Sequence, residues 1–242
     1  MYTRGTMALE PVISVVVPAY NEERIIATCL QHLQAQDLQL PYEIIIANNN
    51  STDNTAAIAE KLGARVLNVA EKGYVHAAIA GVQAARGGII AMTDADTRVP
   101  PHWLRRIYET LQARPELVAV GGPFEFHDGP RGVRTVIRLL NRISPRLMIA
   151  SFSGTNMAFR KSAYEAVGGF DPKINLQADT YLGNRLAKHG KTMLIKDNVV
   201  QSSGRRYQTV GQIISETVVR MVNAFWLKLF NTTLFKNQAD IR

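Results

Sequence analysis

The chain has 242 residues, is 46% hydrophobic and 20% charged, and carries a formal net charge of +8. This composition is typical of a globular domain with a sizeable core and argues against a disordered or fibrous protein. The single cysteine, Cys29, excludes a disulfide within the chain and predicts a buried thiol in a reducing compartment. The sequence lacks both a run of roughly 18 to 20 apolar residues that would span a membrane and a signal-peptide core, so we expect a cytoplasmic protein.

Short β-rich runs alternate with helical patterns along the first half of the chain. Strands are predicted at residues 12–17, 43–47, 65–69, 89–92 and 118–120. Helices are predicted between them, at residues 22–36, 53–62, 74–85 and 101–111. This order predicts an α/β fold with a mostly parallel sheet flanked by helices. Ligands bind beyond the carboxyl ends of such strands, where the loops at residues 18–23, 48–53 and 94–97 are expected to meet.

Asp94-Ala95-Asp96 follows the apolar strand predicted at residues 89–92. If the segment is extended, Asp94 and Asp96 point to the same side and can bind one divalent cation. Mg²⁺ or Mn²⁺ held this way keeps positions open for substrate phosphates, which favours a nucleotide-diphosphate ligand. A polar turn after a buried strand is the alternative.

The excess positive charge lies mostly in the second half of the chain and suggests an anionic partner. Between Arg131 and Arg146, three arginines recur every fourth residue beside an apolar stripe, namely Arg134, Arg138 and Arg142. Residues 213–230 form a second amphipathic pattern, rich in aromatic side chains and with Lys228 near its end. The first helix is expected to pack on its own domain, whereas the second suits either a docking helix or a peripheral membrane anchor.

Five sequence blocks, in order, resemble the family-2 glycosyltransferases, which are inverting enzymes with a GT-A fold. The resemblance covers residues 12–211, and no internal repeat or second domain is evident. It is carried by Val15 to Glu23, Ile44 to Thr55, Lys72-Gly73, Asp94-Ala95-Asp96, and Gly154 to Arg160 with Gly168 to Asp171. It implies an N-terminal extension (1–11), a GT-A domain (12–208, with a nucleotide-binding half at 12–98 and an acceptor half at 99–208) and a C-terminal amphipathic helix (209–242).

The resemblance assigns the first two loops to the nucleotide. Backbone near Pro18, Ala19 and Tyr20 would approach the nucleotide, and Glu22 would accept hydrogen bonds from the ribose, although Glu22 also suits the start of a helix. Asn48 stands where the family commonly has an aspartate that binds the imide N–H of uracil. An amide can both accept and donate, so uracil, guanine and thymine stay open. Asp53, in the same loop, is expected to cap the helix at 53–62.

The resemblance also assigns charged residues to the phosphates. Lys72 would lie near the nucleotide or its phosphates, Asp96 would hold the metal, and Asp94 and Ala95 would lie nearer the ribose or sugar. Arg205 and Arg206 could close over the diphosphate because guanidinium groups match phosphate oxygens, or they could form a solvated basic loop. Ile79-Ala80 replaces the family's polar Arg-Asn pair.

Asp179 matches the family's catalytic base, while Ala178 replaces the acidic residue that usually precedes it. Without that like charge, a raised pKa at Asp179 would have to come from burial. Capping of a helix is the alternative role for Asp179. In the catalytic reading, Asp179 takes the proton from an acceptor hydroxyl that attacks the anomeric carbon opposite the leaving diphosphate, with inversion.

The sequence therefore predicts a glycosyltransferase that uses a nucleotide-diphosphate sugar, Mn²⁺ or Mg²⁺, and a carbohydrate or lipid-linked acceptor, at or near the inner face of the membrane. The family's Gln-x-x-Arg-Trp motif for processive transfer is missing, which favours one sugar per encounter. A non-catalytic membrane-surface adaptor is one alternative. A sugar-phosphate nucleotidyltransferase would need a basic glycine-rich loop after the first strand, and nucleic-acid binding would need a recognisable module, so both are weaker.

Overall fold

The computed structural model describes residues 10–143, 153–174, 176–230 and 232–234. Its main sheet contains seven strands: β1 (Ile13–Ala19), β2 (Tyr42–Asn48), β3 (Arg65–Asn68), β4 (Ile89–Met92), β5 (Leu117–Gly121), β7 (Met157–Arg160) and β8 (Lys191–Leu194). Their order is β3-β2-β1-β4-β7-β5-β8. Every neighbouring pair is parallel except those that β7 makes with β4 and β5. The predicted α/β fold with a mostly parallel sheet is confirmed.

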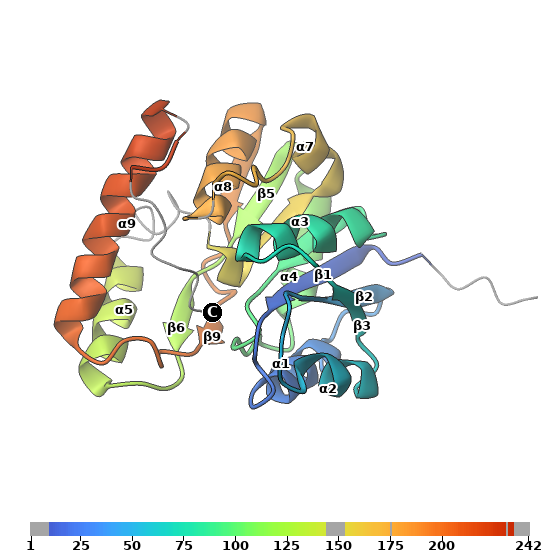
Figure 1. The fold of residues 1–242 in the computed structure, drawn as a ribbon. Helices are drawn as coiled ribbons and strands as arrows, with labels where there is room; N and C mark the ends of the chain where they lie inside the picture. The colour runs from blue at the N-terminus through green and yellow to red at the C-terminus, as the bar shows by residue number, and fades with distance from the viewer. Residues whose placement is uncertain (1–9, 144–152, 175, 231, 235–242) are drawn as a thin grey trace, which may run out of the picture.

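Helices cover both faces of this sheet (Figure 1). One face carries α1 (Ile26–Gln34), α2 (Thr55–Lys61) and α4 (Trp103–Ala113), and the other carries α3 (Tyr74–Ala84), α7 (Lys161–Ala166) and α8 (Ala178–His189). Alternate side chains of β1 supply the two cores, since Val15 and Val17 pack toward α1 and α4 while Val16 packs toward α3 and α8. Burial on both faces explains why β1 is an unbroken apolar run in sequence.

Gly81 sets the distance between α3 and the sheet. A Cβ at this position would lie 2.4 Å from Val16 Cγ1, so only glycine permits the helix to pack this closely. The close contact holds α3 against β1 and places the start of the helix, at Tyr74, near the carboxyl edge of the sheet.

A smaller layer stands beside the main sheet, at the left of Figure 1. It contains β6 (Phe124–Phe126) paired in parallel with β9 (Val200–Ser202), together with α5 (Arg131–Ile143) and α9 (Val210–Phe230). Phe126, Val133, Ile137 and Ile213 form the core of this layer. Within the residues that the structure describes, no helix combines the length and the apolar character needed to cross a bilayer.

Several local expectations need correction. The first helix begins at Ile26 instead of residue 22, because residues 23–25 form a turn, so Glu22 lies outside the helix. Pro18 does not end the first strand, since it pairs with Ala47 inside β1. The strands β6, β7, β8 and β9 were not predicted, because each has only three or four residues, too few for a periodic pattern to stand out.

The structure also tests the predictions made for Cys29 and Asp53. Cys29 is a buried free thiol, as predicted, and burial raises its pKa. Asn54, not Asp53, occupies the N-cap position of α2. Asp53 still accepts a hydrogen bond from the amide of Thr55 at 3.0 Å, and its second oxygen binds the amide of Glu23 at 3.0 Å. Asp53 therefore ties the start of α2 to the loop that follows β1.

Candidate active site at the carboxyl edge of the sheet

The loops that follow β1, β2 and β4 lie at one edge of the sheet, because these strands are adjacent and parallel. Pro18 and Ala19 form the last residues of β1, and Tyr20 follows them, partly buried. The amide of Asn49 donates to the carbonyl of Ala19 at 2.8 Å, which joins the first two loops. The structure thus brings together the three loops that the sequence assigned to this edge.

Asp94 and Asp96 approach each other through a turn, not through an extended segment as the sequence suggested. The amide of Thr97 donates to the carbonyl of Asp94 at 3.1 Å and closes this turn around the buried Ala95. The side chain of Asp94 accepts a hydrogen bond from the hydroxyl of Thr155 at 2.6 Å. A turn is favoured here because β4 ends at Met92, two residues before Asp94.

Asp96 is a largely buried carboxyl group at this edge with a raised pKa. Its side chain is only 12% exposed, accepts a hydrogen bond from the hydroxyl of Ser202 at 3.3 Å, and lies 3.6 Å from a guanidinium nitrogen of Arg205. Burial, followed by the negative charge of Asp94, raises the pKa of Asp96 from 3.8 to about 6. The guanidinium group of Arg205 and, to a smaller extent, that of Arg206 lower this pKa.

Arg205 joins the C-terminal part of the chain to the first loop. Its guanidinium donates to Oε1 of Glu22 at 2.5 Å. The loop that carries Arg205 is anchored by Asp128, which accepts hydrogen bonds from the hydroxyl of Ser203 at 2.9 Å and from the amide of Gly204 at 2.6 Å. Arg205 is therefore held at the site although its side chain is 43% exposed, which argues against a merely solvated basic loop. Arg206 is exposed as well.

Asn48 is buried at the end of β2, with 6% exposure. Its amide nitrogen donates to Oδ1 of Asn68 at 2.7 Å, but its own Oδ1 has no hydrogen-bond partner among the described residues. A buried acceptor without a donor is destabilising unless a ligand or water supplies one. Nearby, Asn49 accepts a hydrogen bond from the amide of Gly73 at 2.7 Å and positions the loop that bears the exposed Lys72.

Asp179 is the second residue of α8 and lies on the other side of this edge. Its two carboxylate oxygens accept hydrogen bonds from the amides of Gly154 at 2.7 Å and Thr180 at 2.8 Å. Burial raises the pKa of Asp179, and the two amides only partly oppose this shift. The N-cap position of α8 is occupied by Gln177, so Asp179 is not the cap.

The short turn η1 (Gly154–Asn156) connects the two acidic groups. Gly154 binds Asp179, and the next residue, Thr155, binds Asp94. A Cβ at Gly154 would lie 2.2 Å from the hydroxyl of Tyr74 and 3.7 Å from Oδ2 of Asp179. The hydroxyl of Tyr74 and the carboxylate of Asp179 therefore border the same small volume beside Gly154, and any side chain there would fill it.

The residues at this edge fit a divalent cation that shares its ligands with a substrate. Asp94 and Asp96 offer carboxylate oxygens, and the pKa of Asp96 is raised first by burial and then by the negative charge of Asp94. Within the described parts of the chain, no group of three or more His, Cys, Asp or Glu side chains could hold a metal by itself. Mg²⁺ is commonly bound by one or two carboxylates together with substrate phosphates and water, so the donor set suits a cation that arrives with a diphosphate.

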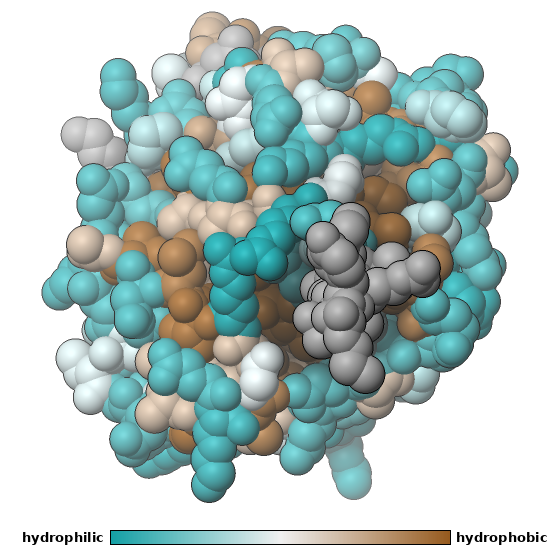
Figure 2. Space-filling model, turned by 90° about the vertical axis from the view of Figure 1, so that its right-hand side faces the viewer, coloured by the Kyte–Doolittle hydropathy of each residue, from teal (hydrophilic) through white to brown (hydrophobic). Residues whose placement is uncertain are grey.

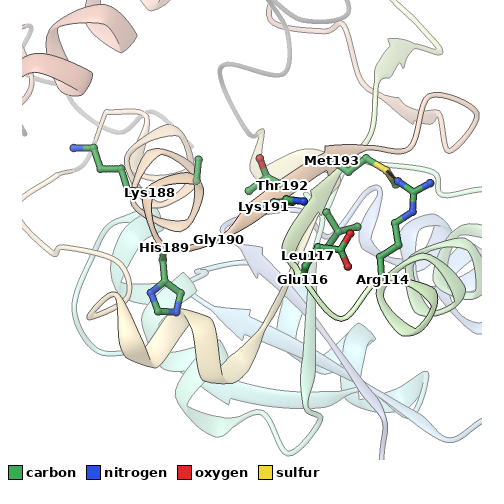
Figure 3. Close-up of a pocket in the computed structure, with 10 residues that line it drawn as sticks. Arg114, Glu116, Leu117, Lys188, His189, Gly190, Lys191, Thr192 and Met193 are labelled. Atoms are coloured by element: carbon green, nitrogen blue, oxygen red, sulfur yellow. Dashed lines mark hydrogen bonds between the residues drawn. The ribbon is translucent and has the colours of Figure 1, made fainter.

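A separate surface pocket of about 670 Å³ lies at the opposite edge of the sheet, where β5 and β8 begin. It is lined by basic side chains that include Arg114, Lys188 and His189. Figure 3 shows that Lys188 and His189 point away from Arg114, so these groups do not converge on one ligand. The pocket contains none of the site residues predicted from the sequence.

Residues 14–168 match Glycosyl transferase family 2. The chain belongs to this family. The glycosyltransferase AglE of Haloferax volcanii is 26% identical to it over 204 residues, which are 78% of this chain and 66% of AglE. The chain thus spans slightly under two thirds of that relative.

Two solved structures have the same fold as this family-2 chain. The mannosyltransferase PcManGT from Pyrobaculum calidifontis, in complex with GDP-Man and Mn²⁺, has a TM-score of 0.69 and 23% identity, and the alignment covers 88% of this chain and 63% of that one. Glucosyl-3-phosphoglycerate synthase from Mycobacterium tuberculosis, in complex with Mn²⁺, UDP-Glc and phosphoglyceric acid, has a TM-score of 0.63 and 20% identity over 90% of this chain and 79% of that one. The predicted GT-A fold is confirmed.

The structure adds residues to the site that sequence reasoning did not find. Thr155 and Gly154 belong to a recognised block, but nothing in the sequence linked them to Asp94 and Asp179. Ser202 lies three residues before Arg205 in the segment already considered, but its hydrogen bond to Asp96 was not predicted. Tyr74 and Asp128 carried no sequence signal, because their roles depend on segments far away in the chain.

Proposed function

We propose that this family-2 chain is an inverting glycosyltransferase that moves a sugar from a nucleotide-diphosphate donor to an acceptor hydroxyl. The observation that supports this proposal most is the pair of hydrogen bonds made by consecutive residues of η1. Gly154 binds Asp179 and Thr155 binds Asp94. A carboxylate suited to a proton acceptor is thereby held close to carboxylates suited to the donor's diphosphate.

On the donor side, the buried and unpaired Oδ1 of Asn48 would accept an N–H of the base, and Pro18, Ala19 and Tyr20 would line the nucleotide. Glu22 would bind the ribose once the donor displaces its contact with Arg205. Ala95, Lys72, Arg205 and Arg206 would lie near the sugar or the phosphates. Of the two solved structures with this fold, one holds GDP-Man and the other UDP-Glc. The fold is therefore compatible with guanine or uracil, and the base has to be determined by experiment.

On the acceptor side, Asp179 would remove the proton of the attacking hydroxyl. The raised pKa of Asp179, caused by burial, makes it a stronger base than an ordinary aspartate. The hydroxyl oxygen forms the new bond to the anomeric carbon while the bond to the diphosphate oxygen breaks on the opposite face, so the configuration inverts and no covalent enzyme intermediate forms. The guanidinium of Arg205 would stabilise the charge that develops on the leaving diphosphate.

We propose that Asp96, together with Asp94, holds Mn²⁺ or Mg²⁺. When bound, such a cation acts as a Lewis acid toward the leaving diphosphate. The two residues suit this task because both are acidic and are separated only by Ala95, because Asp96 is largely shielded from water, and because Thr155 fixes the orientation of Asp94.

The proposed division of labour follows the chain, with nucleotide binding in residues 12–98 and acceptor binding in residues 99–208. One sugar would be transferred per encounter, to a carbohydrate or a lipid-linked acceptor, by a cytoplasmic protein at the inner face of the membrane. The apolar outer surface of α9 favours the lipid-linked acceptor, and its contacts are argued below.

Calorimetric titration with UDP, GDP and dTDP, each with Mn²⁺ and with EDTA, tests the donor part of the proposal. We expect one diphosphate to bind in a metal-dependent way, and Asp96→Ala to abolish the dependence. Asp197→Ala is the matched control, because Asp197 is exposed and contacts only Arg106 on the surface among its described partners. Transfer to an acceptor, followed by NMR of the anomeric proton, tests inversion.

Failure of all three diphosphates to bind would contradict the proposal and favour a non-catalytic membrane-surface adaptor on a GT-A scaffold. The exposed apolar surface of α9 is the observation that keeps this second candidate. A sugar-phosphate nucleotidyltransferase is disfavoured by the family to which the chain belongs.

A further inference from the structure

Apolar side chains are concentrated on the outer surface of α9. Twelve large hydrophobic residues are exposed in the described parts of the chain, and nine of them lie on this one helix. Figure 1 shows α9 at the edge of the molecule beside α5. Figure 2 shows the opposite side, where the protruding side chains are mostly hydrophilic. The exposed apolar surface is therefore local, which is the usual mark of an interaction site.

The periodicity of α9 separates a packed side from an exposed side. Ile213, Asn223 and Leu227 are buried against the domain. The α9 stripe, defined here as the exposed apolar side chains that recur every three or four residues along one side of the helix, consists of Ile214, Val218, Met221, Val222, Phe225 and Leu229. Phe225 is 65% exposed. The helix is thus apolar on two sides, of which the domain covers only one.

The charges beside the α9 stripe are mainly positive. The neighbouring helix α5 has no acidic residue and carries four arginines, Arg131, Arg134, Arg138 and Arg142. Arg138 pairs with Glu125 of β6, whereas Arg131 is exposed. On α9 itself, Glu216 is the one acidic residue, and Arg220 lies on the side opposite the stripe, where its charge acts on Asp179 and Tyr207. A second copy of the chain would bring like charges together here, while an anionic surface would attract them.

We propose that the α9 stripe and the arginines of α5 form a docking surface for an anionic lipid bilayer. On it, α9 lies in the plane of the interface, with the stripe entering the boundary between headgroups and acyl chains and the arginines contacting lipid phosphates. Helices with an apolar side and neighbouring cationic groups bind membranes in this way, by apolar burial together with electrostatic attraction.

Hydrogen bonds connect α9 to the start of α8, which carries the candidate base Asp179. Docking of α9 on a membrane would therefore affect how an acceptor reaches the site. Asn223 donates to the side chain of Gln177 at 2.8 Å, and Gln177 donates in turn to the carbonyl of Arg220 at 3.2 Å. Gln177 is the N-cap of α8, two residues before Asp179, and has a left-handed backbone with φ 58°. An acceptor held in the bilayer would therefore reach the site from the side of Asp179, a consequence that rests on the function proposed above.

Flotation with vesicles tests the docking surface without any donor, metal or activity. The full chain is mixed with vesicles of phosphatidylcholine plus phosphatidylglycerol, or of phosphatidylcholine alone, at low and high salt. We expect binding to the anionic vesicles that weakens with salt. Phe225→Glu should reduce the partition constant at least about tenfold, since burial of a phenyl group favours an apolar phase by that factor or more. Arg131→Gln should reduce it about fivefold.

Two control variants carry the same added negative charge. Gln212→Glu places it on α9, on the side turned away from the stripe. Leu40→Glu places it on an exposed apolar residue outside α9. Both should keep most of the binding of the unaltered chain. Unchanged nucleotide binding and circular dichroism would show that Phe225→Glu leaves the fold intact.

Absence of binding to anionic vesicles at low salt, or binding that Phe225→Glu leaves unchanged, would overturn the proposal. Analytical ultracentrifugation supplies the alternative outcome: a dimer that Phe225→Glu dissociates, without vesicle binding, would assign the stripe to a second copy of the chain. Vesicle binding together with failed nucleotide titrations would leave the docking surface standing and reject the glycosyltransferase function. Nucleotide binding without vesicle binding would reject the docking surface and leave the glycosyltransferase function standing.

Discussion

The backbone amide of Gly154 donates a hydrogen bond to Oδ2 of Asp179 at 2.7 Å. Through the next residue, Thr155, the same turn also holds Asp94. Two acidic groups that the sequence places 85 residues apart are thus positioned by consecutive residues of one short turn. Small changes in this turn should affect the donor and acceptor sides of the site separately, which makes it a sensitive place for substitutions.

Thr155→Val should weaken metal-dependent nucleotide binding about tenfold. Valine keeps the shape of threonine but cannot donate to Asp94, so the carboxylate loses the contact that orients it, worth about 1.5 kcal/mol. Calorimetric titration with Mn²⁺ measures this change. Thr97→Val is a suitable control, because the buried hydroxyl of Thr97 has no hydrogen-bond partner among the described residues. Equal effects from the two substitutions would argue against a role for Thr155.

Asp179→Asn should lower kcat about 10²- to 10⁴-fold, the range typical of a lost general base, while nucleotide affinity stays unchanged. Asparagine cannot take up the acceptor proton. Stopped assays of sugar transfer measure kcat, and Asp171→Asn, which changes a carboxylate that only accepts from the amide of Lys173 in the described structure, is the control. A variant with normal turnover would exclude Asp179 as the base.

The value of kcat/KM should decrease as the pH is lowered. Burial raises the pKa of Asp179, so its carboxyl group is protonated at a higher pH than an ordinary aspartate. The ionised base is needed, so kcat/KM should be fully developed above this raised pKa and should fall as the pH decreases through it. A profile of kcat/KM against pH measures this, and an acid limb at the ordinary pKa of aspartate would contradict the expectation.

Arg205→Gln should reduce diphosphate affinity about 10- to 100-fold, whereas Arg206→Gln should have a smaller effect. Arg205 contacts both Glu22 and Asp96, and hydrogen bonds between charged groups contribute about 1.5 to 3 kcal/mol. Arg206 lowers the pKa of Asp96 less than Arg205 does. Titration of both variants with the same nucleotide compares them, and a larger loss at Arg206 would reverse our ranking.

Asn156→Ala should lower the free energy of unfolding by about 3 kcal/mol or more. The side chain of Asn156 accepts from the indole N–H of Trp103 at 2.8 Å and donates to the carbonyls of Asn198 and Pro123. The indole N–H and the carbonyl of Asn198 would lose this partner in the core, at about 1.5 kcal/mol or more each. The carbonyl of Pro123 keeps the amide of Val200, which donates to it at 3.1 Å. Urea unfolding measures the change. Gln39→Ala, at an exposed amide, should be nearly neutral.

Glu43→Gln should destabilise the fold by about 1 to 2 kcal/mol at neutral pH. Burial alone would raise the pKa of Glu43, but hydrogen bonds from Ser14, the amide of Arg86 and Arg65 together lower it. Because the folded-state pKa lies below the usual 4.5, this contribution is complete above that pH and disappears as the pH falls through the lowered value.

Urea unfolding of both proteins across this pH range checks the prediction about Glu43. The difference between the unaltered chain and Glu43→Gln should shrink on acidification. Glu60→Gln, at an exposed residue of α2, provides the control and should show a small difference at every pH. A difference at Glu43 that stays constant with pH would mean that packing, not charge, explains it.

The central strands and the helices between them could be predicted because local periodicity determines them. β4 was predicted with its observed bounds, and α3 differs by one residue. The loops at the carboxyl edge followed from the parallel order of the strands, which depends on the alternation of strands and helices along the chain. Asp94, Asp96 and Asp179 were found because their residue types and their neighbours match a family pattern.

The sequence by itself determined the fold class, the family and the acidic residues, since each depends on residue types and spacing within a short segment. Only the tertiary structure decided that Thr155 orients Asp94, that Arg205 contacts Glu22, and which side of α9 stays exposed. These contacts join residues that are far apart along the chain, as the 183 positions between Glu22 and Arg205 illustrate. No local pattern encodes them, because they arise from how the separate elements pack against one another.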